Sequence, residues 1–445
     1  MIQTWRKTSS ELIYSPNVIK DIHMKTIDGY DVKIFTDNIE DTAIEQIRQL
    51  LSIDVFSDCK IRIMPDVHAG AGCVIGFTGN LGDKVIPNIV GVDIGCGMLV
   101  QPFICNNPID FHALNEYILR AIPSGRDFRD ENYLPLSQKY SDIYQNAKQL
   151  ILQLRCYREL KEVRRLYKSI GSLGSGNHFI ELDKDESDLY YLVVHTGSRN
   201  LGKQVADIYQ KLAVKCQSGW DKLMVEKNRI IEEYKQAGRK SELQDVIRNL
   251  HNSFKTCKLT IPQDLCYLQG QFREDYLHDM HICQCWAQIN RKLIVNLIMD
   301  FIVGKGVVSS EEHFRPFESV HNYIGNDNII RKGAISARLG EKCIIPLNMR
   351  DGSLICIGKG NEDWNFSAPH GAGRIMSRSQ AFKEISLEDF KKSMEDVYSE
   401  TVTEYTKDES PMVYKSKHEI MDNINDTVDI ENVIKPVFNF KAADL

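Results

Sequence analysis

The stretch VIPNIVGVDIGCGMLV, residues 85–100, shows the pattern that decides the fold. Apolar, strand-like runs flank a turn in which glycines surround Asp93 and Cys96. Glycine allows such a turn to close tightly, and a carboxylate and a thiolate three residues apart can reach the same divalent ion. A structural turn with a buried cysteine explains these residues equally well, so the turn alone does not establish a metal site.

The rest of the chain alternates between strand-like runs with glycine-rich turns and long helical segments. Strand-like runs fill the chain up to about residue 106, return at residues 171–197 and resume from residue 321. Helical, charged sequence occupies residues 136–169 and 201–302. No internal repeat and no regular βαβ alternation is visible. The pattern therefore predicts an α+β fold with long helical insertions between blocks of strands.

Composition and charge indicate the class of protein. Hydrophobic residues make up 42% of the 445 residues and charged residues 26%, which is ordinary for a soluble globular protein. The most apolar stretch, residues 293–308, is interrupted by Asp300 and Lys305 and is too short to span a bilayer. Twelve cysteines without framework spacing, and no signal-peptide run in the opening residues, predict reduced thiols, a cytoplasmic location and no membrane partner.

Any contact with nucleic acid must come from a local basic patch, because the net charge is −6. The sequence RCYRELKEVRRLYK, residues 155–168, would place most of its basic residues along one helical stripe, where they could contact phosphates. A solvated helix face explains them equally well. The charged segment 220–254 predicts an exposed helical hairpin that turns near Ala237 and Gly238 and is either a docking surface or bare.

Three histidines are placed like the ligand candidates of the first turn. His178, His195 and His321 each lie at the end of a strand-like run beside a polar or glycine-rich turn, where side chains face clefts. Each one alone is more often a hydrogen-bonding histidine than a ligand. Together with Asp93 and Cys96 they make a metal site the better interpretation.

A second cluster of histidine and cysteine is a weaker candidate. Residues 277–291, LHDMHICQCWAQINR, contain two histidines and two cysteines. The surrounding pattern is helical, and Cys283 and Cys285 would face different sides of that helix. No second Cys/His pair lies at zinc-finger spacing. We therefore expect these side chains to belong to the core and surface of a helix.

A fourth candidate, His370, lies in a glycine-rich loop within NEDWNFSAPHGAGRIMSR, residues 361–378. Gly371 and Gly373 leave the main chain bare, and successive amides in such a loop suit an anion. Lys332, in the sequence RKGA, is a second candidate for contact with phosphate. These residues indicate that the protein handles a nucleotide or another phosphate.

Seven motifs occur in a characteristic order along the chain. They are MPDVHAGAGCVIGFT (64–78), VGVDIGCGM (90–98), GSGNHFIEL (174–182), VVHTGSRNLG (193–202), VHNYIG (320–325), RKGA (331–334) and PHGAGRIMSR (369–378). In this order they resemble the RtcB family of RNA ligases, from about Arg62 to Lys441. Seven motifs in order are far more specific than any one of them.

The resemblance implies a fold and an activity. The fold would be the family's own α+β fold, with a β-rich, sandwich-like core around the active site. Residues 1–445 would form one catalytic domain, with residues 201–302 as a helical insertion within it. Family members join an RNA end with a 2′,3′-cyclic phosphate or 3′-phosphate to a 5′-hydroxyl end, using GTP and two manganese ions. RNA and GTP are therefore the expected partners, and some members also require an activating protein.

The resemblance also assigns the metal ligands. Cys96 would bridge two Mn²⁺ ions as a thiolate. Asp93 and His178 would complete one metal site, and His195 and His321 would complete the other. Sulfur, imidazole and one carboxylate are compatible with Mn²⁺, although zinc would bind such a site more tightly.

His370 would attack the α-phosphate of GTP and carry GMP as a guanylylated histidine. The GMP would pass to the RNA 3′-phosphate, and the 5′-hydroxyl would then expel it. Asp66 and His68 of the first motif are expected to line the same cleft. The positions expected to contact the nucleotide are Asn177, Glu181, His321, Asn322, Lys332, Asn348, Ser353, His370, Gly371, Ala372, Gly373, Tyr414 and Lys441.

One segment departs from the family pattern. Residues 345–360 read IPLNMRDGSLICIGKG, with Leu347 and Asn348 where many members have a Gly-Ser pair, and Pro369 is also unusual. These differences suggest a divergent, bacterial-type branch, and they place the nucleotide preference in question. Two other functions stay open: an RNA-end-binding metalloprotein that does not ligate, and a cyclic phosphodiesterase. Whether the RNA is mended in repair or in tRNA splicing also stays open.

Overall fold

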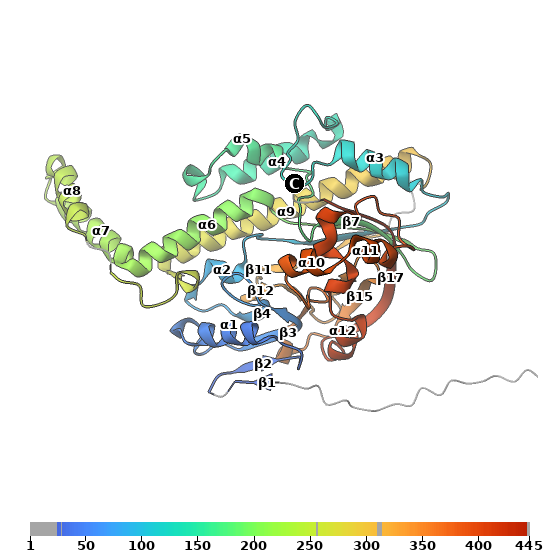
Figure 1. The fold of residues 1–445 in the computed structure, drawn as a ribbon. Helices are drawn as coiled ribbons and strands as arrows, with labels where there is room; N and C mark the ends of the chain where they lie inside the picture. The colour runs from blue at the N-terminus through green and yellow to red at the C-terminus, as the bar shows by residue number, and fades with distance from the viewer. Residues whose placement is uncertain (1–24, 28, 255–256, 309–313, 443–445) are drawn as a thin grey trace, which may run out of the picture.

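The computed structural model describes residues 25–27, 29–254, 257–308 and 314–442. The opening residues, in which the sequence shows no signal-peptide run, lie outside these ranges. No helix in the described part of the chain combines the length and the apolar character that a membrane crossing requires. The mixture of two large sheets with separate helical layers confirms the predicted α+β class (Figure 1).

The smaller sheet has six strands in the order β1-β2-β3-β4-β12-β11. Their bounds are β1 Lys25–Thr26, β2 Val32–Ile34, β3 Ile61–His68, β4 Ile75–Asn80, β12 Ile329–Lys332 and β11 Asn322–Ile324. All pairs are antiparallel except β2 with β3. This sheet carries the MPDVH motif on β3 and the RKGA motif at the end of β12, with β4 between them, so it brings two distant motifs into one sheet.

The larger sheet has seven strands in the order β10-β6-β8-β7-β17-β15-β14, all antiparallel. Their bounds are β10 Phe317–Val320, β6 Gly97–Phe103, β8 Tyr190–Thr196, β7 Phe179–Lys184, β17 Val428–Lys441, β15 Gly352–Gly358 and β14 Lys342–Asn348. The sheet curls until its edges meet, where Ile344 N donates to Ser319 Oγ at 3.0 Å. The core is thus a nearly closed barrel, whereas the resemblance implied a sandwich-like arrangement.

Side chains alternate between the inside and the outside of this barrel. Met98, Val193 and Ile355 pack with each other inside it. Ile180 of β7 and Leu192 of β8 belong instead to the large core between the barrel and the helices. The alternation follows from the period of two residues in a strand, and it separates an interior that opens toward the site from an exterior covered by helices.

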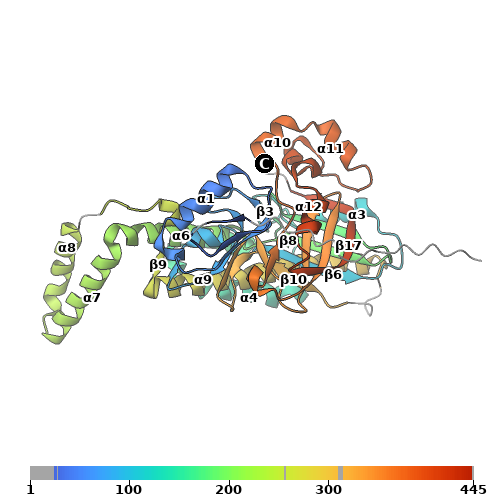
Figure 2. The ribbon, with the colours of Figure 1, turned by 90° about the horizontal axis from the view of Figure 1, so that it is seen from below.

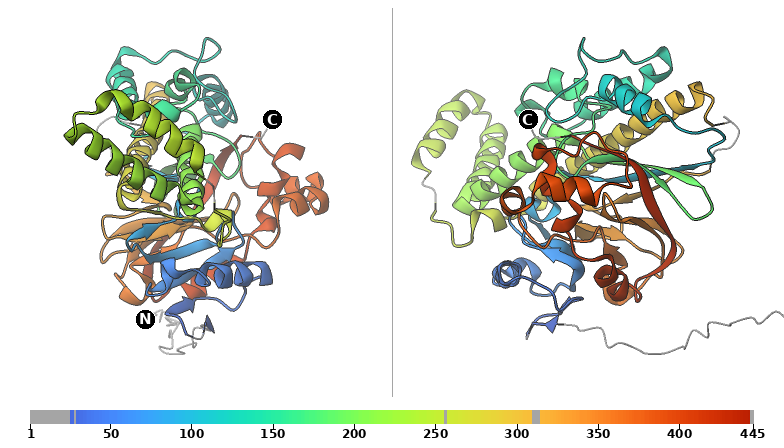
Figure 3. Two further views of the ribbon diagram at one scale, coloured as in Figure 1. Left: turned by 90° about the vertical axis from the view of Figure 1, so that its left-hand side faces the viewer. Right: turned by 45° about the vertical axis from the view of Figure 1, so that its right-hand side comes forward.

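Two long helices, α6 (Arg199–Lys215) and α9 (Gly270–Gly304), run side by side along the outside of the barrel. Helices α3 (Phe111–Ala121), α4 (Ser141–Leu152) and α5 (Val163–Lys168) lie on one side of this pair, and the six-stranded sheet lies on the other (Figure 3). Apolar residues recur on several faces of α9, because the helix touches the barrel, α4 and α6 at once. This explains why its sequence reads as the most apolar stretch without being a membrane span.

The remaining elements are short apart from the hairpin described next. The helices are α1 (Asp41–Leu51), α2 (Pro87–Val90), α10 (Arg378–Glu384), α11 (Leu387–Ser393) and α12 (Lys417–Asn423). Two further strand pairs are β5 (Lys84–Val85) with β9 (Leu268–Gln269), and β13 (Ala334–Ser336) with β16 (Ser367–Pro369).

The predicted helical hairpin is present. Helices α7 (Asp221–Gln236) and α8 (Leu243–Ser253) project from the body of the protein, and the chain turns at Ala237 and Gly238 (Figures 1 and 2). No residue of α8 is buried. The charged sequence of this segment therefore reflects exposure to solvent, as expected.

Two expectations about other helical segments have different outcomes. The histidines and cysteines of residues 277–291 lie on the single helix α9, as predicted. The expectation of one helical stripe over residues 155–168 is wrong. α4 ends at Leu152, a short 3-10 turn follows, and α5 starts only at Val163, because Glu162 has a left-handed backbone with φ of 49°. The basic residues are therefore distributed over separate turns.

Candidate active site

The five predicted metal ligands converge at one end of the barrel. Asp93 and Cys96 lie in the turn before β6, and His178 immediately precedes β7. His195 is the penultimate residue of β8, and His321 joins β10 to β11. Since β6 pairs with both β8 and β10, and β7 pairs with β8, these strand ends meet at the same edge.

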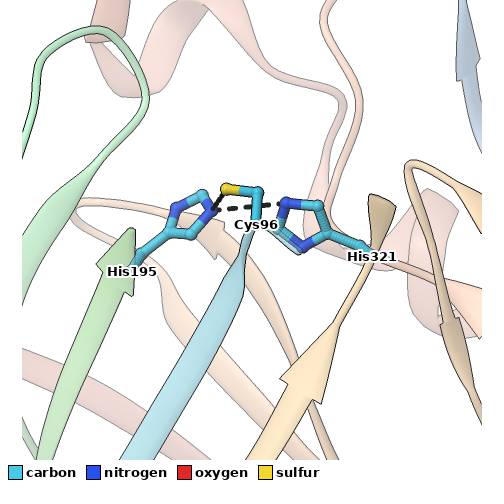
Figure 4. Close-up of side chains that lie close together, drawn as sticks. All are labelled: Cys96, His195 and His321. Carbon is cyan, nitrogen blue, oxygen red and sulfur yellow. Dashed lines mark hydrogen bonds between the residues drawn. The ribbon is translucent and has the colours of Figure 1, made fainter. Parts of the chain in front are cut away.

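The ligand atoms form two groups that share the sulfur of Cys96. Cys96 Sγ lies 3.3 Å from His195 Nε2, which lies 3.4 Å from His321 Nε2. Figure 4 shows these three side chains converging from neighbouring strand ends. In the second group, His178 Nε2 lies 3.4 Å from the same sulfur and 3.0 Å from Asp93 Oδ2. The two groups are those that the resemblance implied from the sequence.

Backbone contacts hold the ligand turns together. Cys96 N donates to Asp93 O at 3.1 Å and closes the first turn. Cys96 O accepts from His321 N at 2.9 Å, which joins the turn to the β10–β11 connection. A Cβ atom at Gly197 would overlap the carboxylate of Asp93, so a side chain there would displace that carboxylate from the ligand group.

A buried arginine supports the same turns from behind. Arg291 of α9 donates Nη1 to the carbonyl oxygens of Gly95 and Thr196, both at 2.7 Å. Its Nε donates to Glu318 on β10 at 2.5 Å. The long helix therefore fixes three neighbouring strand ends through one side chain. Nothing in the sequence marked Arg291, because it stands in an unremarkable helical segment.

The electrostatics of the cluster favour a bound cation. Burial raises the pKa of the Cys96 thiol well above its usual value, and the charge of Asp93 adds to this effect. Burial also lowers the pKa of His195 and His321 well below the usual value, and neighbouring imidazoles reinforce the shift. Asp93 Oδ1 and the Nδ1 atoms of His178 and His321 have no hydrogen-bond partner among the described residues. Metal ligation would use the thiolate and the imidazole lone pairs, and the donor set of one sulfur, three imidazoles and a carboxylate fits a divalent transition metal.

His370 lies beside this cluster and is held by a buried carboxylate. Its ring centroid is 4.8 Å from that of His321. Asp66 on β3 is 0% exposed, and its Oδ2 lies 2.7 Å from His370 Nδ1 and accepts from His370 N at 3.2 Å. The contact orients the ring and leaves Nε2 as the nitrogen available for chemistry. Gly373 has φ of 75°, and a Cβ atom there would lie 2.5 Å from Asp66 O, so glycine lets the loop lie against β3.

A cavity of about 660 Å³ opens beside His370. Its volume is within the range of small-molecule sites. The carbonyl oxygen of Asn177, which also lines it, accepts from His195 Nδ1 at 3.1 Å and so orients Nε2 of that ring toward the other ligands. The expected nucleotide-contacting residues that line this cavity are Asn177, Glu181, Asn348, His370, Gly371, Ala372, Gly373, Tyr414 and Lys441. Asp66 lies behind His370, whereas His68 lines the cavity as expected.

One buried glutamate, Glu409, organises a wall of this cavity. Its Oε2 accepts from Lys441 Nζ at 2.5 Å and from Tyr414 Oη at 2.7 Å. Its Oε1 lies 3.3 Å from Arg374 Nη1 and 2.8 Å from Arg378 Nη1. Burial opposes ionisation, but the charges of Lys441, Arg378 and Arg374 prevail and lower the pKa of Glu409 to about 2. Lys441 is thus a buried ion-pair partner on β17, and Arg374 folds the loop through Glu409 and the carbonyl of Asp408.

Comparison with known proteins identifies the family of this chain. The family model described as "tRNA-splicing ligase RtcB" matches residues 46–442. The chain belongs to the RtcB family. It is 30% identical to the RNA-splicing ligase RtcB of Escherichia coli (strain K12), in an alignment that covers 86% of this chain and 90% of the relative. It is 24% identical to the tRNA-splicing ligase RtcB of Methanococcus maripaludis, in an alignment that covers 86% of this chain and 87% of the relative.

In this RtcB chain, four expected nucleotide-contacting residues do not line the cavity: His321, Asn322, Lys332 and Ser353. Lys332 is 5% exposed, and its Nζ donates to Ala71 O at 2.6 Å and Cys73 O at 3.0 Å. A third donation goes to Asn88 O at 3.2 Å. An ammonium group has three N–H donors, so none remains for a phosphate in this arrangement.

Asn322 and Ser353 also occupy positions behind the cavity. Asn322 Nδ2 donates to Asp93 O at 3.3 Å, and its Oδ1 accepts from Gly333 N at 3.1 Å. It therefore joins the metal-ligand turn to the RKGA turn. Ser353 is fully buried, and its Oγ has no hydrogen-bond partner among the described residues.

The segment that departs from the RtcB pattern lies on the cavity wall. Residues 346–349 line the cavity at the end of β14. Asn348 Oδ1 accepts from Arg350 N at 3.0 Å and Asp351 N at 2.9 Å, and its Nδ2 donates to Asp351 Oδ2 at 2.8 Å. The altered residues therefore build a closed turn, and the cavity beside them stays open.

A second cavity, of about 520 Å³, adjoins two of the predicted metal ligands. Its lining combines Asp93 and His178 with four cationic side chains, Arg126, Arg165, Arg199 and Lys203. Asn177 lines both cavities. The ligand cluster therefore lies where the His370 cavity and a cation-lined cavity come together.

Glu409, like Arg291, was not among the site residues predicted from the sequence. It lies in the sequence DESPMVYK, five residues before Tyr414, and an acid this close to a predicted nucleotide-contacting residue was the available signal. Asp66 was expected only to line the cleft, whereas the structure gives it direct contact with His370.

Proposed function

We propose that this protein is a GTP-dependent RNA ligase that joins an RNA 3′-phosphate or 2′,3′-cyclic phosphate end to a 5′-hydroxyl end. The observation that carries the proposal is the position of His370. It is oriented by Asp66, lines a cavity of nucleotide size and lies next to a five-residue metal cluster. Membership of the RtcB family, whose curated relatives are named RNA-splicing or tRNA-splicing ligases, supports the same activity.

His370 supplies the nucleophile. Its Nε2 forms a bond to the α-phosphorus of GTP while the bond to the bridging oxygen breaks and pyrophosphate leaves. An oxygen of the RNA 3′-phosphate then attacks the same phosphorus and frees His370. The 5′-hydroxyl oxygen of the second RNA end attacks the activated 3′-phosphorus and releases GMP. A cyclic phosphate must first be opened by water to the 3′-phosphate.

Two divalent ions, which we propose to be Mn²⁺, fit the ligand cluster. Asp93, Cys96 and His178 would hold one ion, and Cys96, His195 and His321 the other. When bound, the ions would supply positive charge for the phosphate oxygens that gain negative charge during transfer. The chain itself orients the ligands through the Asn177 carbonyl and the Arg291 side chain, as described above.

The two cavities suggest how the substrates are divided. We assign GTP to the cavity of His370, where Glu409 holds Lys441 and Tyr414 in place. The cation-lined cavity suits an RNA backbone, because arginine and lysine bind phosphates without regard to sequence. Both substrates would then reach the phosphate-transfer site from opposite sides of Asn177.

Labelled GTP tests the proposal directly. Incubation of the protein with GTP labelled in its α-phosphate and with Mn²⁺ should give a covalent adduct that is labile in acid, as expected for a phosphoramidate. His370→Ala should abolish the adduct. His112→Ala is the matched control, because the His112 side chain is exposed and bonds only to Glu400 among the described residues.

The joining reaction is then measured with an RNA pair that carries a cyclic phosphate and a 5′-hydroxyl. A metal-replete sample that forms no adduct, or an adduct that persists in His370→Ala, would show that His370 is not the nucleophile. An adduct without RNA joining would point to an acceptor other than an RNA 3′-phosphate.

A further inference from the structure

A buried acid below the cavity that we assign to GTP has no role in the chemistry described so far. Asp183 on β7 is 0% exposed, and neither of its carboxylate oxygens has a hydrogen-bond donor among the described residues. Two residues earlier on the same strand, Glu181 lines the cavity. Alternate residues of a strand share a face, so both acids project into the barrel on the side of Phe179, which packs inside it.

The two acids are both buried and lie two residues apart on one face of β7. Two buried carboxylates side by side cannot both ionise at moderate cost, because each raises the energy of the other's charge. Glu181 is the better anion, since its Oε2 accepts from Asn439 Nδ2 and the charge of Lys441 also favours it. The proton therefore belongs on Asp183, which can donate it to Glu181.

The surroundings of Asp183 agree with this assignment. Across the sheet it faces Tyr191 of β8, whose hydroxyl donates to Asp185, and Pro436 of β17, which has no N–H. Among the described residues, Glu181 is the charged side chain that acts on Asp183. Burial, and then the charge of Glu181, raises the pKa of Asp183 well above its usual value. Burial also raises the pKa of Glu181, although bonds from Asp183 and Asn439 oppose the shift.

We propose that Asp183 is a positioning residue for nucleobase selection: its carboxylic acid donates to Glu181 from below and turns the remaining lone pairs of that carboxylate toward the cavity. The proposal rests on the assignment of GTP to this cavity. A carboxylate has about four acceptor positions, and Asp183 and Asn439 occupy two of them. The other two match the adjacent N1–H and N2–H donors of guanine, whereas adenine presents an acceptor at N1.

Two substitutions separate a hydrogen-bonding role from a packing role. Asp183→Asn keeps a donor of nearly the same size, so GTP affinity should stay close to that of the parent protein. Asp183→Ala removes the donor and should weaken GTP binding about tenfold or more, while ATP binding changes little. At saturating GTP the rate of His370 adduct formation should be retained, because Asp183 touches neither the reacting phosphate nor His370. Glu186→Gln, an exposed acid-to-amide change just beyond the same strand, is the matched control.

A pH series measures the shared proton without GTP. In the folded protein Asp183 keeps its proton to a higher pH than in the unfolded chain, so the unfolded state binds fewer protons and stability falls as the pH rises. Asp183→Asn has no carboxyl group to hold this proton, so the variant should lack this fall in stability. Relative to the parent, its folding equilibrium constant should improve by about tenfold per pH unit from about pH 4 up to the folded-state pKa. Urea unfolding at several pH values gives this slope, and the parent protein should show a carboxylic-acid C=O infrared band that the variant lacks.

The outcomes distinguish this inference from the proposed function. An unchanged ratio of GTP to ATP affinity in Asp183→Ala would overturn the positioning role, even with the pH signature present. Equal pH dependence of stability in Asp183→Asn and the parent would overturn the shared proton. Failure of the parent protein to bind GTP would instead overturn the assignment of the cavity, and hence the positioning role that rests on it, while the stability slope would still report on the proton.

Discussion

The candidate metal-binding cluster and the cavity beside His370 touch each other, yet they are built in different ways. The five predicted metal ligands lie at neighbouring strand ends of one barrel, and backbone hydrogen bonds such as that from His321 N to Cys96 O fix their positions. The cavity draws on β3, β7, the His370 loop, Tyr414 and the end of β17. Its parts are joined by carboxylates that bind other side chains, namely Asp66 and Glu409.

This difference predicts different sensitivities. Positions set by a sheet's backbone change little with pH or with a single side chain remote from the ligands. Positions set by buried ion pairs depend on both partners, because loss of one partner leaves an uncompensated buried charge. Substitutions at the cluster should therefore remove function while the fold persists, and substitutions in the cavity wall should affect nucleotide binding and stability together.

The largest expected effect comes from Cys96→Ala. Both ligand groups lose their shared sulfur, so we expect Mn²⁺ content to fall and adduct formation to drop by more than about 100-fold. Stability without metal should change little, because the turn is held by backbone contacts and by Arg291. Metal analysis, the labelled-GTP assay and urea unfolding measure the three quantities. Cys285→Ala on α9, away from the cluster, is the matched control, and full Mn²⁺ occupancy in Cys96→Ala would contradict the bridging role.

Glu409→Gln should have the next largest effect, and it should act on the cavity wall alone. The folded-state pKa of Glu409 is about 2, below its ordinary value of 4.5, so its contribution to stability is present above about pH 4.5 and is lost as the pH falls toward 2. The shift corresponds to roughly 3 kcal/mol at neutral pH. The variant should therefore be less stable than the parent at pH 7, with a smaller difference at pH 3.5, and it should bind GTP more weakly.

The control for this prediction is Glu404→Gln, an exposed acid in the same segment whose ion pair with Lys407 is partly solvated. Mn²⁺ content should stay unchanged in both variants, since Glu409 does not contact the ligands. A stability loss that is the same at pH 3.5 and pH 7 would show that Glu409 acts by packing and not by charge.

The sequence indicated the candidate metal-binding cluster far better than the cavity, for a physical reason. Each ligand occupies a glycine-rich or polar turn at the end of an apolar run, and such local signals are readable one segment at a time. Three further predictions that rest on local sequence signals were confirmed: the α+β class, the hairpin turn at Ala237 and Gly238, and membership of the family. The roles of the individual site residues stay predictions until the experiments above are made.

The parts that the sequence did not reveal depend on long-range packing. Glu409, Arg291 and Asp183 are ionisable residues whose neighbours in the sequence give no sign of a site. Only the fold buries them beside their partners. Lys332 is the reverse case. It stands in a motif that favours phosphate contact, yet three carbonyl oxygens from distant turns take all of its donors. The prediction of a continuous basic stripe was also wrong, because the left-handed backbone at Glu162 interrupts the helix.

The smallest expected effect comes from Asn348→Ala, in the segment that departs from the RtcB pattern. Asn348 Oδ1 accepts from two backbone N–H groups and closes the turn that carries residues 346–349 along the cavity. Loss of these bonds should cost about 1–2 kcal/mol of stability and weaken GTP binding a few-fold, because the wall becomes less ordered. Thermal unfolding and titration with GTP measure the two effects.

Arg350→Ala is the matched control for Asn348→Ala. Arg350 lies in the same turn, but its side chain pairs with Asp351 on the outside. Its side chain is 45% exposed, and such pairs contribute little, so neither stability nor GTP affinity should change measurably. If Arg350→Ala weakens GTP binding as much as Asn348→Ala does, the turn acts on the nucleotide through charge and not through order. This part of the wall would then depend on charge, as the part around Glu409 does. The segment that departs from the family's Gly-Ser pattern would have gained an electrostatic contact with the nucleotide.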